Sequence, residues 1–259
     1  MCAATVGQVT SSQLPNGGQF YDETGVLDKY LSHRHSSTRS PNVVMEEPAF
    51  FSEMGDIEDK RVLDLGCGDA AFADRVIDSG GRSYVGVDGS AAMIDEARRH
   101  IEHPRVSLVC ERIEDYRVAP DSFDLVTSRM ALHYINDLDS ILLNVRKFLS
   151  PGGHLIFTVL HPVITSKWTP TDGPRTDYTV DRYFERGARE REWFGSTVTW
   201  HHRTIEDYIS SVQRSGLKFV SLRECEPDPK LLVDHPDELE RRRRVPLILL
   251  VSARRPGGE

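Results

Sequence analysis

The sequence has few cysteines and no long apolar run. Its four cysteines stand far apart without the spacing of a metal site. Three of them, Cys67, Cys110 and Cys225, lie in or beside expected strands, which predicts buried free thiols. No apolar stretch approaches membrane-spanning length, and the N-terminus lacks the segments of a signal peptide. We therefore expect no metal, no membrane partner and a cytoplasmic location.

The chain also lacks an excess of positive charge. With 259 residues, 28% of them charged, and a net charge of -8, it resembles an ordinary globular protein with a sizeable core. The negative balance argues against a long phosphate-neutralising surface, so no nucleic-acid partner is expected. The one basic run, Arg241 to Arg244, follows several acidic residues. We interpret it as a solvated, internally balanced face, with anion binding as the alternative.

Periodicity divides the chain into five parts. Residues 1–18 are small and polar without a period, which predicts a disordered tail. Residues 19–55 predict short helices that form an N-terminal cover. A core over 56–160 and its C-terminal part over 204–259 flank an aromatic insertion over 161–203. Loss of periodicity in a compact domain is typical of a lid, and its three tryptophans indicate an aromatic or bulky apolar ligand.

Short apolar segments alternate with helical stripes throughout the core, which is typical of a parallel sheet with helices on both faces. Strands are expected at 61–65, 83–88, 106–109, 123–128, 154–160, 217–224 and 246–253. The last two have only a short connection and are predicted to pair antiparallel. The fold class expected is α/β, a Rossmann-like doubly wound seven-stranded sheet, mostly parallel with one antiparallel strand. Such sheets bind ligands at the carboxyl ends of their strands.

The glycine turn after the first strand leaves two ligands open. Gly66-x-Gly68-x-x-Ala71 satisfies the dinucleotide pattern, and Asp88 stands near the spacing of its ribose-binding acid. Asp64 ends the first strand, where it would repel a pyrophosphate but attract a ligand with an ammonium group and a positive sulfur. This carboxylate favours S-adenosylmethionine. A nicotinamide-dependent oxidoreductase is the alternative, and Asp64 could also merely cap the turn.

Four segments resemble the successive motifs of the class I S-adenosylmethionine-dependent methyltransferases, most closely the small-molecule branch often called type 11. They are "VLDLGCGDAAFA", "YVGVDGSAAMIDEAR", "DSFDLVTSRMALHYI" and "FLSPGGHLIFTVLHP", in the family's order and each at an expected strand end. The resemblance covers residues 40–160 strongly. It implies methyl transfer, with S-adenosylhomocysteine as product. A protein of this fold that uses the bound cofactor for a non-methylating cyclisation or elimination is a second alternative.

The resemblance also implies where the cofactor is held. Asp64 would face its methionyl part, Asp88 its ribose hydroxyls, and Met93 its adenine ring, with a core position on the helix as the alternative for Met93. The full set implied is Tyr21, Tyr30, Asp64, Gly66, Gly68, Asp88, Gly89, Met93, Ile113 and Ser128. One position departs from the family: Arg112 stands where an aspartate usually receives the adenine amino group, and arginine cannot accept a hydrogen bond. Glu111 and Glu114 are the alternatives there.

Methyl transfer needs a nucleophile held in line with the methyl group, exclusion of water, and in some cases a base. His133 follows the fourth strand and His161 ends the fifth, so both are predicted to be catalytic residues. The alternatives are packing under the lid for His133 and shaping of the lid's entry for His161. His201 and His202 precede the next helix, and one of them could face inward. The expected partner is a small, partly apolar acceptor, assigned to specialised metabolism; monomer and homo-oligomer both stay open.

Overall fold

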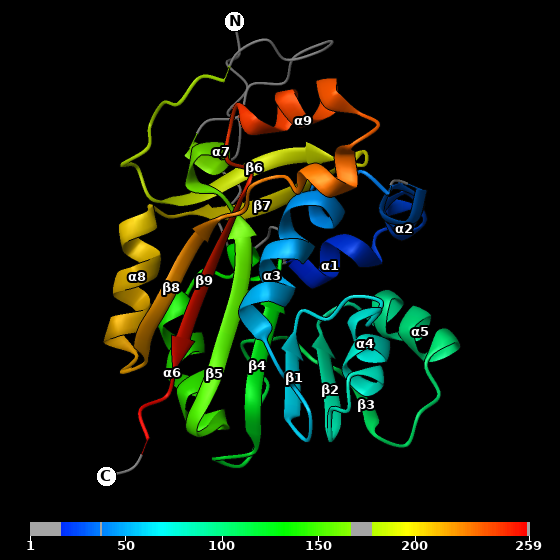
Figure 1. The fold of residues 1–259 in the computed structure, drawn as a ribbon, viewed down its shortest axis with the longest axis vertical. Coiled ribbons are helices and arrows are strands. Elements are labelled where there is room, and N and C mark those ends of the chain that lie inside the picture. The colour runs from blue at the N-terminus through cyan, green and yellow to red at the C-terminus, as the bar shows by residue number, and fades with distance from the viewer. Residues whose placement is uncertain (1–16, 37, 167–177, 258–259) are drawn as a thin grey trace, which may run out of the picture.

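The computed structural model of the protein describes residues 17–36, 38–166 and 178–257 (Figure 1). Most of the predicted tail and Trp168 of the predicted lid lie outside these residues. The tail prediction extends two residues too far, because Gly17 and Gly18 begin helix α1 (Gly17–Asp22). The rest of the cover consists of α2 (Val26–Ser36), the π-helical turn η1 (Asn42–Glu46) and α3 (Glu47–Met54).

Seven strands form one sheet in the order β3-β2-β1-β4-β5-β9-β8. Their bounds are β1 (Arg61–Leu65), β2 (Ser83–Asp88), β3 (Val106–Cys110), β4 (Phe123–Arg129), β5 (Leu149–Leu160), β8 (Lys218–Glu224) and β9 (Ile248–Arg254). Strand β9 is antiparallel to both of its neighbours, whereas the pairs from β3 to β5 are parallel. The predicted fold class is therefore confirmed.

Helices cover both faces of the sheet, which makes three layers (Figure 1). One hydrophobic cluster packs α6 (Leu138–Phe148) and α8 (Ile205–Arg214) against the strands. A second cluster packs α3, α4 (Phe72–Asp78) and α5 (Ala91–His100) against the other face. The short helices are η2 (Leu132–Tyr134), α7 (Pro162–Ser166), η3 (Pro229–Leu232) and α9 (Pro236–Arg243).

Local sequence signals fix where two of the main helices begin. The Ser90 hydroxyl accepts the Met93 N–H at the start of α5. Thr204 and Asp207 form a reciprocal capping box at the start of α8, as the sequence predicts. Because α5 begins directly after β2, its cap also places Asp88 at the carboxyl end of that strand.

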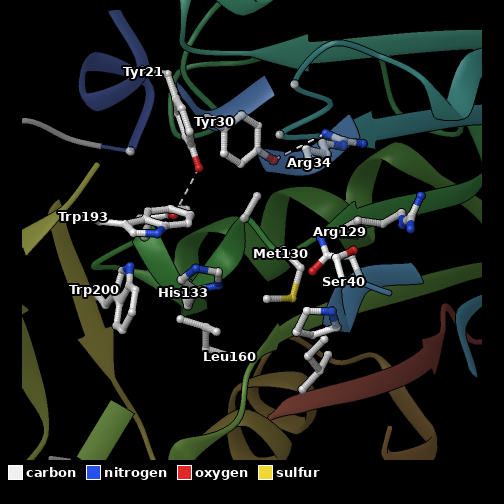
Figure 2. A pocket seen from close by; sticks show the side chains of 18 of the residues that line it. Tyr21, Tyr30, Arg34, Ser40, Arg129, Met130, His133, Leu160, Trp193 and Trp200 are labelled. Atoms are coloured by element: carbon white, nitrogen blue, oxygen red, sulfur yellow. Dashed lines mark hydrogen bonds between the residues drawn. The ribbon is translucent and has the colours of Figure 1, made fainter. Parts of the chain in front are cut away.

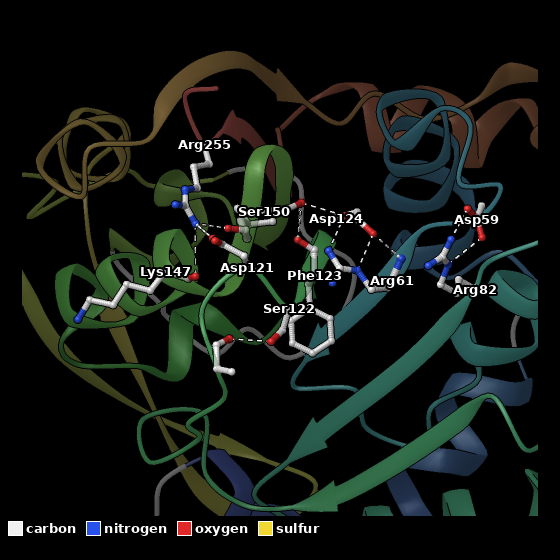
Figure 3. Close-up of polar contacts among 12 residues, drawn as sticks. Asp59, Arg61, Arg82, Asp121, Ser122, Phe123, Asp124, Lys147, Ser150 and Arg255 are labelled. Carbon is white, nitrogen blue, oxygen red and sulfur yellow. Dashed lines mark hydrogen bonds and ion pairs between the residues drawn. The ribbon is translucent and has the colours of Figure 1, made fainter. Parts of the chain in front are cut away.

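Charged side chains close the amino ends of the central strands (Figure 3). Arg61, which begins β1, donates two side-chain hydrogen bonds to Asp124 of β4, at 3.0 and 2.9 Å. The Ser150 hydroxyl donates to the same carboxylate at 2.8 Å. Hydrogen bonds from Arg61 hold the pKa of Asp124 well below its usual range. This end of the sheet is therefore held by a fully partnered polar cluster.

The predicted irregular lid contains a regular β-hairpin, which is a correction to the sequence analysis. Strands β6 (Gly187–Trp193) and β7 (Ser196–His202) pair antiparallel as a separate two-stranded sheet. Phe194 and Gly195 form the turn, and both have positive φ, 51° and 89°. Positive φ at both central residues matches a turn whose twist suits a two-residue hairpin. Figure 1 shows the hairpin above the carboxyl ends of the sheet strands.

Two further expectations concern the burial of cysteines and the absence of a membrane-spanning helix. Cys67 and Cys225 are buried as predicted, but Cys110 is exposed, because it ends the edge strand β3, which has a neighbour on one side only. None of the helices in the described ranges is both long enough and apolar enough to cross a membrane.

Candidate active site

A cavity of about 910 Å³ lies at the carboxyl ends of the central strands. It reaches from the glycine turn after β1 to the hairpin and α9. Figure 2 shows side chains from the cover, from β4 and from the hairpin around one common space. Of the predicted site residues, it is lined by Tyr21, Tyr30, Asp64, Gly66, Gly68, Asp88, Gly89, Met93, Ile113 and His133.

The glycine turn is built around the Asp88 carboxylate. One oxygen accepts the Gly68 N–H and the other accepts the Ser90 N–H, both at 2.9 Å. Burial raises the pKa of Asp88 to about 6, although these two N–H groups oppose the effect. Gly66 has a φ of +77°, and a Cβ there would lie 2.3 Å from the Ala131 Cβ. The turn therefore requires glycine at position 66 for both its backbone conformation and its packing.

Asp64 reaches the cavity from inside the sheet. Its two oxygens accept hydrogen bonds from the Tyr84 and Thr127 hydroxyls, each at 2.8 Å. Burial raises the pKa of Asp64, while the two hydroxyl donors oppose that rise. Among the described residues, this carboxylate is held in place by neutral donors rather than by a cation in direct ion-pair contact.

The cover and the hairpin meet over the cavity. The Tyr21 and Tyr134 hydroxyls lie 3.3 Å apart, and the rings of Tyr21 and Tyr30 are 4.9 Å apart. Phe20 stacks on Trp193 of the hairpin at 5.8 Å. The Lys29 ammonium donates to the carbonyl of the hairpin turn at 3.1 Å. The N-terminal helices and the hairpin thus form one aromatic roof, which the sequence predicted only as two separate segments.

His133 is fully enclosed beside this roof. Its ring centroid lies 4.3 Å from that of Tyr134 and 6.1 Å from that of Trp200. Within the described residues, its Nδ1 is buried and has no hydrogen-bond partner. Burial, together with a smaller contribution from the Arg203 charge, lowers the pKa of His133 to about 3. His133 is therefore neutral at physiological pH, and it presents an unpartnered polar atom next to the cavity.

Four other predicted candidates do not line the cavity. Ser128 is buried, and its hydroxyl donates to the Leu65 carbonyl at 2.7 Å, which ties β4 to β1. His161 pairs with Glu224 at 3.0 Å through Nε2 and accepts the Val163 N–H at Nδ1, so both ring nitrogens are engaged. It shapes the entry to α7. His201 and His202 also lie outside the cavity lining.

Sequence analysis missed Arg34 and Arg129, which line the cavity, because their carboxylate partners are distant in the chain. Arg129, at the end of β4, donates from Nε to the fully buried Glu46 at 2.9 Å. Arg34 of α2 pairs with Asp69 at 3.2 Å. Arg112 pairs with Glu114 at 2.9 Å, and both of these residues line the cavity whereas Glu111 does not. Each of these arginines has a carboxylate partner of its own.

The basic run of α9 differs from its predicted solvated face. Arg241, Arg242 and Arg244 line the cavity, and the Arg242 side chain is only 7% exposed. The prediction is therefore wrong for Arg242, whose burial comes from tertiary packing: its guanidinium donates to the Arg39 carbonyl at 2.6 Å. Arg243 is exposed and does not line the cavity. Across the described part of the chain, no group of three or more histidine, cysteine or acidic residues is arranged to hold a metal ion.

Known proteins resemble this chain over most of its length. Residues 62–153 match a family model described as a methyltransferase domain. A putative S-adenosylmethionine dependent methyltransferase from Listeria monocytogenes is 34% identical, with a TM-score of 0.68 over 79% of this chain and 94% of that one. An S-adenosylmethionine dependent methyltransferase from Mesorhizobium loti is 32% identical, with a TM-score of 0.74 over 81% of this chain and 97% of that one.

Among curated proteins, the ubiquinone biosynthesis O-methyltransferase of Coxiella burnetii is 29% identical over 107 residues. That match spans 40% of this chain and 45% of the relative. The strand order, the glycine turn and the two structural matches above 30% identity agree, and they decide against the dinucleotide interpretation of the turn. The chain belongs to the class I S-adenosylmethionine-dependent methyltransferases, and its cofactor is S-adenosylmethionine.

Proposed function

We propose that the protein transfers a methyl group to a nitrogen, oxygen or carbon nucleophile of a small, partly apolar acceptor bound in this cavity. When bound, S-adenosylmethionine supplies an electrophilic methyl group on a positive sulfur. The observation that carries the proposal is continuity: one cavity joins Asp88 and the glycine turn to His133 and the hairpin tryptophans. A single continuous space lets the chain hold two reactants in line.

The residues at the strand ends fit the cofactor. Each Asp88 oxygen accepts one backbone N–H and keeps a lone pair for a further hydroxyl donor, such as those of a ribose. A Cβ at Gly68 would stand 3.6 Å from Arg34 Nη1 and 4.0 Å from Met93 Sδ, so glycine keeps this part of the cavity open. The proposed cofactor-binding residues are Tyr21, Tyr30, Asp64, Gly66, Gly68, Asp88, Gly89, Met93 and Ile113.

Two parts of the site would recognise the positive charges of the cofactor. Asp64 offers its carboxylate to the ammonium group, since its present partners are neutral hydroxyls. Tyr21 and Tyr30 offer ring faces or hydroxyls near the sulfonium. Burial raises the pKa of Tyr21 well above its ordinary value, so its phenol stays neutral. At the adenine end, Glu114 lines the cavity whereas Glu111 does not, so Glu114 would receive the adenine amino group that Arg112 cannot accept.

The chain's remaining task is to orient the acceptor and keep water out. The aromatic roof formed by the cover and the hairpin covers the cavity with large apolar faces. His133 would accept a hydrogen bond from the nucleophile and position it. With a pKa of about 3 in this environment, it would act by orientation rather than by storing a proton.

The side chains near His133 indicate the chemical character of the acceptor's skeleton. Trp193, Trp200, Leu160, Met130 and Ile164 line this part of the cavity and are apolar or aromatic. They favour an aromatic or branched apolar skeleton. The similarity to an O-methyltransferase of ubiquinone biosynthesis supports testing oxygen nucleophiles first. A role in specialised metabolism and a cytoplasmic location are further parts of this proposal.

A screen scored by product mass tests the proposal. The protein is incubated with S-adenosylmethionine and matched pairs of small phenols, anilines and their saturated counterparts. A product heavier by one methyl group in place of hydrogen, formed together with S-adenosylhomocysteine, is the expected result. Consumption of an acceptor without formation of S-adenosylhomocysteine would instead point to the alternatives: a product of unchanged mass would indicate cyclisation, and a product lighter by the leaving group would indicate elimination.

A further inference from the structure

The α9 end of the cavity carries positive charge that its own carboxylate does not balance. Arg241 donates to both oxygens of Glu238, at 2.9 Å from Nε and 2.6 Å from Nη2. Arg242 reaches one of the same oxygens at 2.7 Å. Two guanidinium groups thus share one carboxylate. Arg244 also lines the cavity at this end.

Arg242 is the buried member of this group. Its side chain is 7% exposed, and its Nε is buried without a hydrogen-bond partner among the described residues. A buried donor without a partner is costly, and more so when it belongs to a charged group. Burial lowers the pKa of Arg242 below its ordinary value; Glu238 opposes this effect and Arg241 adds to it. This environment therefore disfavours the charged form of Arg242.

No other carboxylate in the described cavity lining compensates for this charge. Glu47 pairs with Arg129 and Glu114 pairs with Arg112. Asp64 and Asp88 accept their hydrogen bonds from hydroxyls and backbone N–H groups. Arg34, Arg112 and Arg129 each have a carboxylate partner, so an added anion would gain more at α9 than at any of these three arginines.

We infer that the α9 end of the cavity binds an acidic group of the methyl acceptor, a carboxylate or a phosphate, with Arg242 as its main contact and Arg241 and Arg244 beside it. The inference rests on the proposed function, since it assigns one end of the acceptor. Guanidinium forks match the paired oxygens of either acid. In Figure 1, α9 lies above the hairpin, and the sheet strands lie below the hairpin. The acidic group would therefore bind at the end of the cavity away from the glycine turn.

This assignment gives the acceptor a definite chemical class. Leu247 and Ile248 line the cavity close to the basic run in sequence, and Ile164 and Leu160 continue the apolar lining. An acidic head at Arg242 and an apolar or aromatic body against these side chains would direct the nucleophile toward His133. The acceptor is therefore an amphipathic small acid, and its neutral amide or ester is expected to bind more weakly.

Anion titration of the cofactor-product complex tests the inference. The protein is saturated with S-adenosylhomocysteine and titrated at neutral pH and constant ionic strength with inorganic phosphate, and separately with benzoate. Tryptophan fluorescence is the readout, because Trp193 and Trp200 line the cavity. The variants are Arg242→Gln and, as a matched control on the same helix, Arg243→Gln, whose residue is exposed and outside the cavity lining.

At least one of the two anions is expected to bind the wild-type complex, and the stronger one identifies the acid. Arg242→Gln should weaken that binding by at least about tenfold, because a charge-assisted contact is lost, whereas Arg243→Gln should change it by less than about twofold. Affinity for S-adenosylhomocysteine should be the same in all three proteins. Absence of binding by both anions, or equal weakening by the two substitutions, would overturn the inference.

Two further measurements keep the result interpretable. If S-adenosylhomocysteine itself does not bind, the proposed function fails. The same anion titration of the protein without S-adenosylhomocysteine then still tests whether Arg242 binds the anion. If Arg242→Gln lowers the melting temperature strongly, Arg241→Gln replaces it, because Arg241 is 59% exposed and its loss disturbs the fold less. That variant should weaken anion binding by about threefold, and an unchanged affinity would count against the site.

Discussion

The two ends of the central strands differ in how their polar groups are satisfied. At the amino ends, Asp124 receives hydrogen bonds from Arg61 and Ser150, and the cluster is complete within the protein (Figure 3). At the carboxyl ends, His133 Nδ1 and Arg242 Nε are buried without partners among the described residues. Buried polar groups are normally paired, so unpaired ones gathered around one cavity indicate a place that a ligand completes. The amino ends of the strands stabilise the fold, and the carboxyl ends form the ligand-binding site.

Asp88→Ala should have the largest effect on the binding end. It removes the proposed acceptor of two hydroxyl hydrogen bonds and the partner of the Gly68 and Ser90 N–H groups. Affinity for S-adenosylhomocysteine should fall by at least about 100-fold, as expected for the loss of two charge-assisted hydrogen bonds. Calorimetry measures this directly. An unchanged dissociation constant would remove the ribose assignment.

The pH dependence of cofactor binding should report the same carboxylate. Burial raises the pKa of Asp88 to about 6 in the free protein, and hydroxyl donors favour its charged form. The bound form then has the lower pKa, so affinity is constant above this value and falls by up to about tenfold per pH unit below it. Asp88→Asn should lack this break in the profile. A profile that is flat between pH 5 and pH 8 in the wild type would contradict the assignment.

His133→Ala should have a smaller effect, limited to turnover. Loss of one positioning hydrogen bond is expected to lower kcat by about tenfold once an acceptor is known. Because the pKa of His133 is lowered to about 3, its titration should leave no inflection in turnover between pH 5 and pH 8. His100→Ala is the control, since His100 is 66% exposed on α5. An inflection near neutral pH that disappears only in His133→Ala would show that His133 acts as a base instead.

Asp124→Asn should leave cofactor affinity unchanged, which is the smallest effect on binding. The hydrogen bonds from Arg61 hold the pKa of Asp124 below its unfolded value, so its stabilising contribution is present at neutral pH and is lost as the pH falls into the acid range. The substitution should lower the free energy of unfolding by about 1–2 kcal/mol at neutral pH, measured by urea unfolding. A loss of cofactor affinity without a loss of stability would contradict the assignment of the amino ends to fold stability alone.

The sheet and the glycine turn could be predicted from the sequence because their signals are local. Apolar runs that end in Asp64 and Asp88, with a glycine turn or a helix cap after each, define strand ends without any knowledge of packing. Ser128 was the exception: it ends the predicted strand 123–128, but its hydroxyl donates to the Leu65 carbonyl and does not line the cavity.

The roof and the basic end of the cavity could not be predicted because they depend on contacts between distant segments. A Cβ on Gly18 would lie 2.6 Å from the Gly89 carbonyl carbon, so α1 sits on the end of β2 in a way that no local pattern shows. Strand β6 carries alternating charged residues, and its turn has no asparagine or aspartate before the glycine, so the hairpin was missed. Arg242 lies in a charged octapeptide, and only tertiary packing buries it.

Calorimetric titration of the purified protein with S-adenosylmethionine, S-adenosylhomocysteine and NADH, side by side, tests the central claim most directly. The site described at the carboxyl ends predicts that both sulfur compounds bind with one-to-one stoichiometry and that NADH gives no signal. Binding of NADH without the other two would mean that the glycine turn holds a pyrophosphate in spite of Asp64, and it would contradict the account of this end of the molecule.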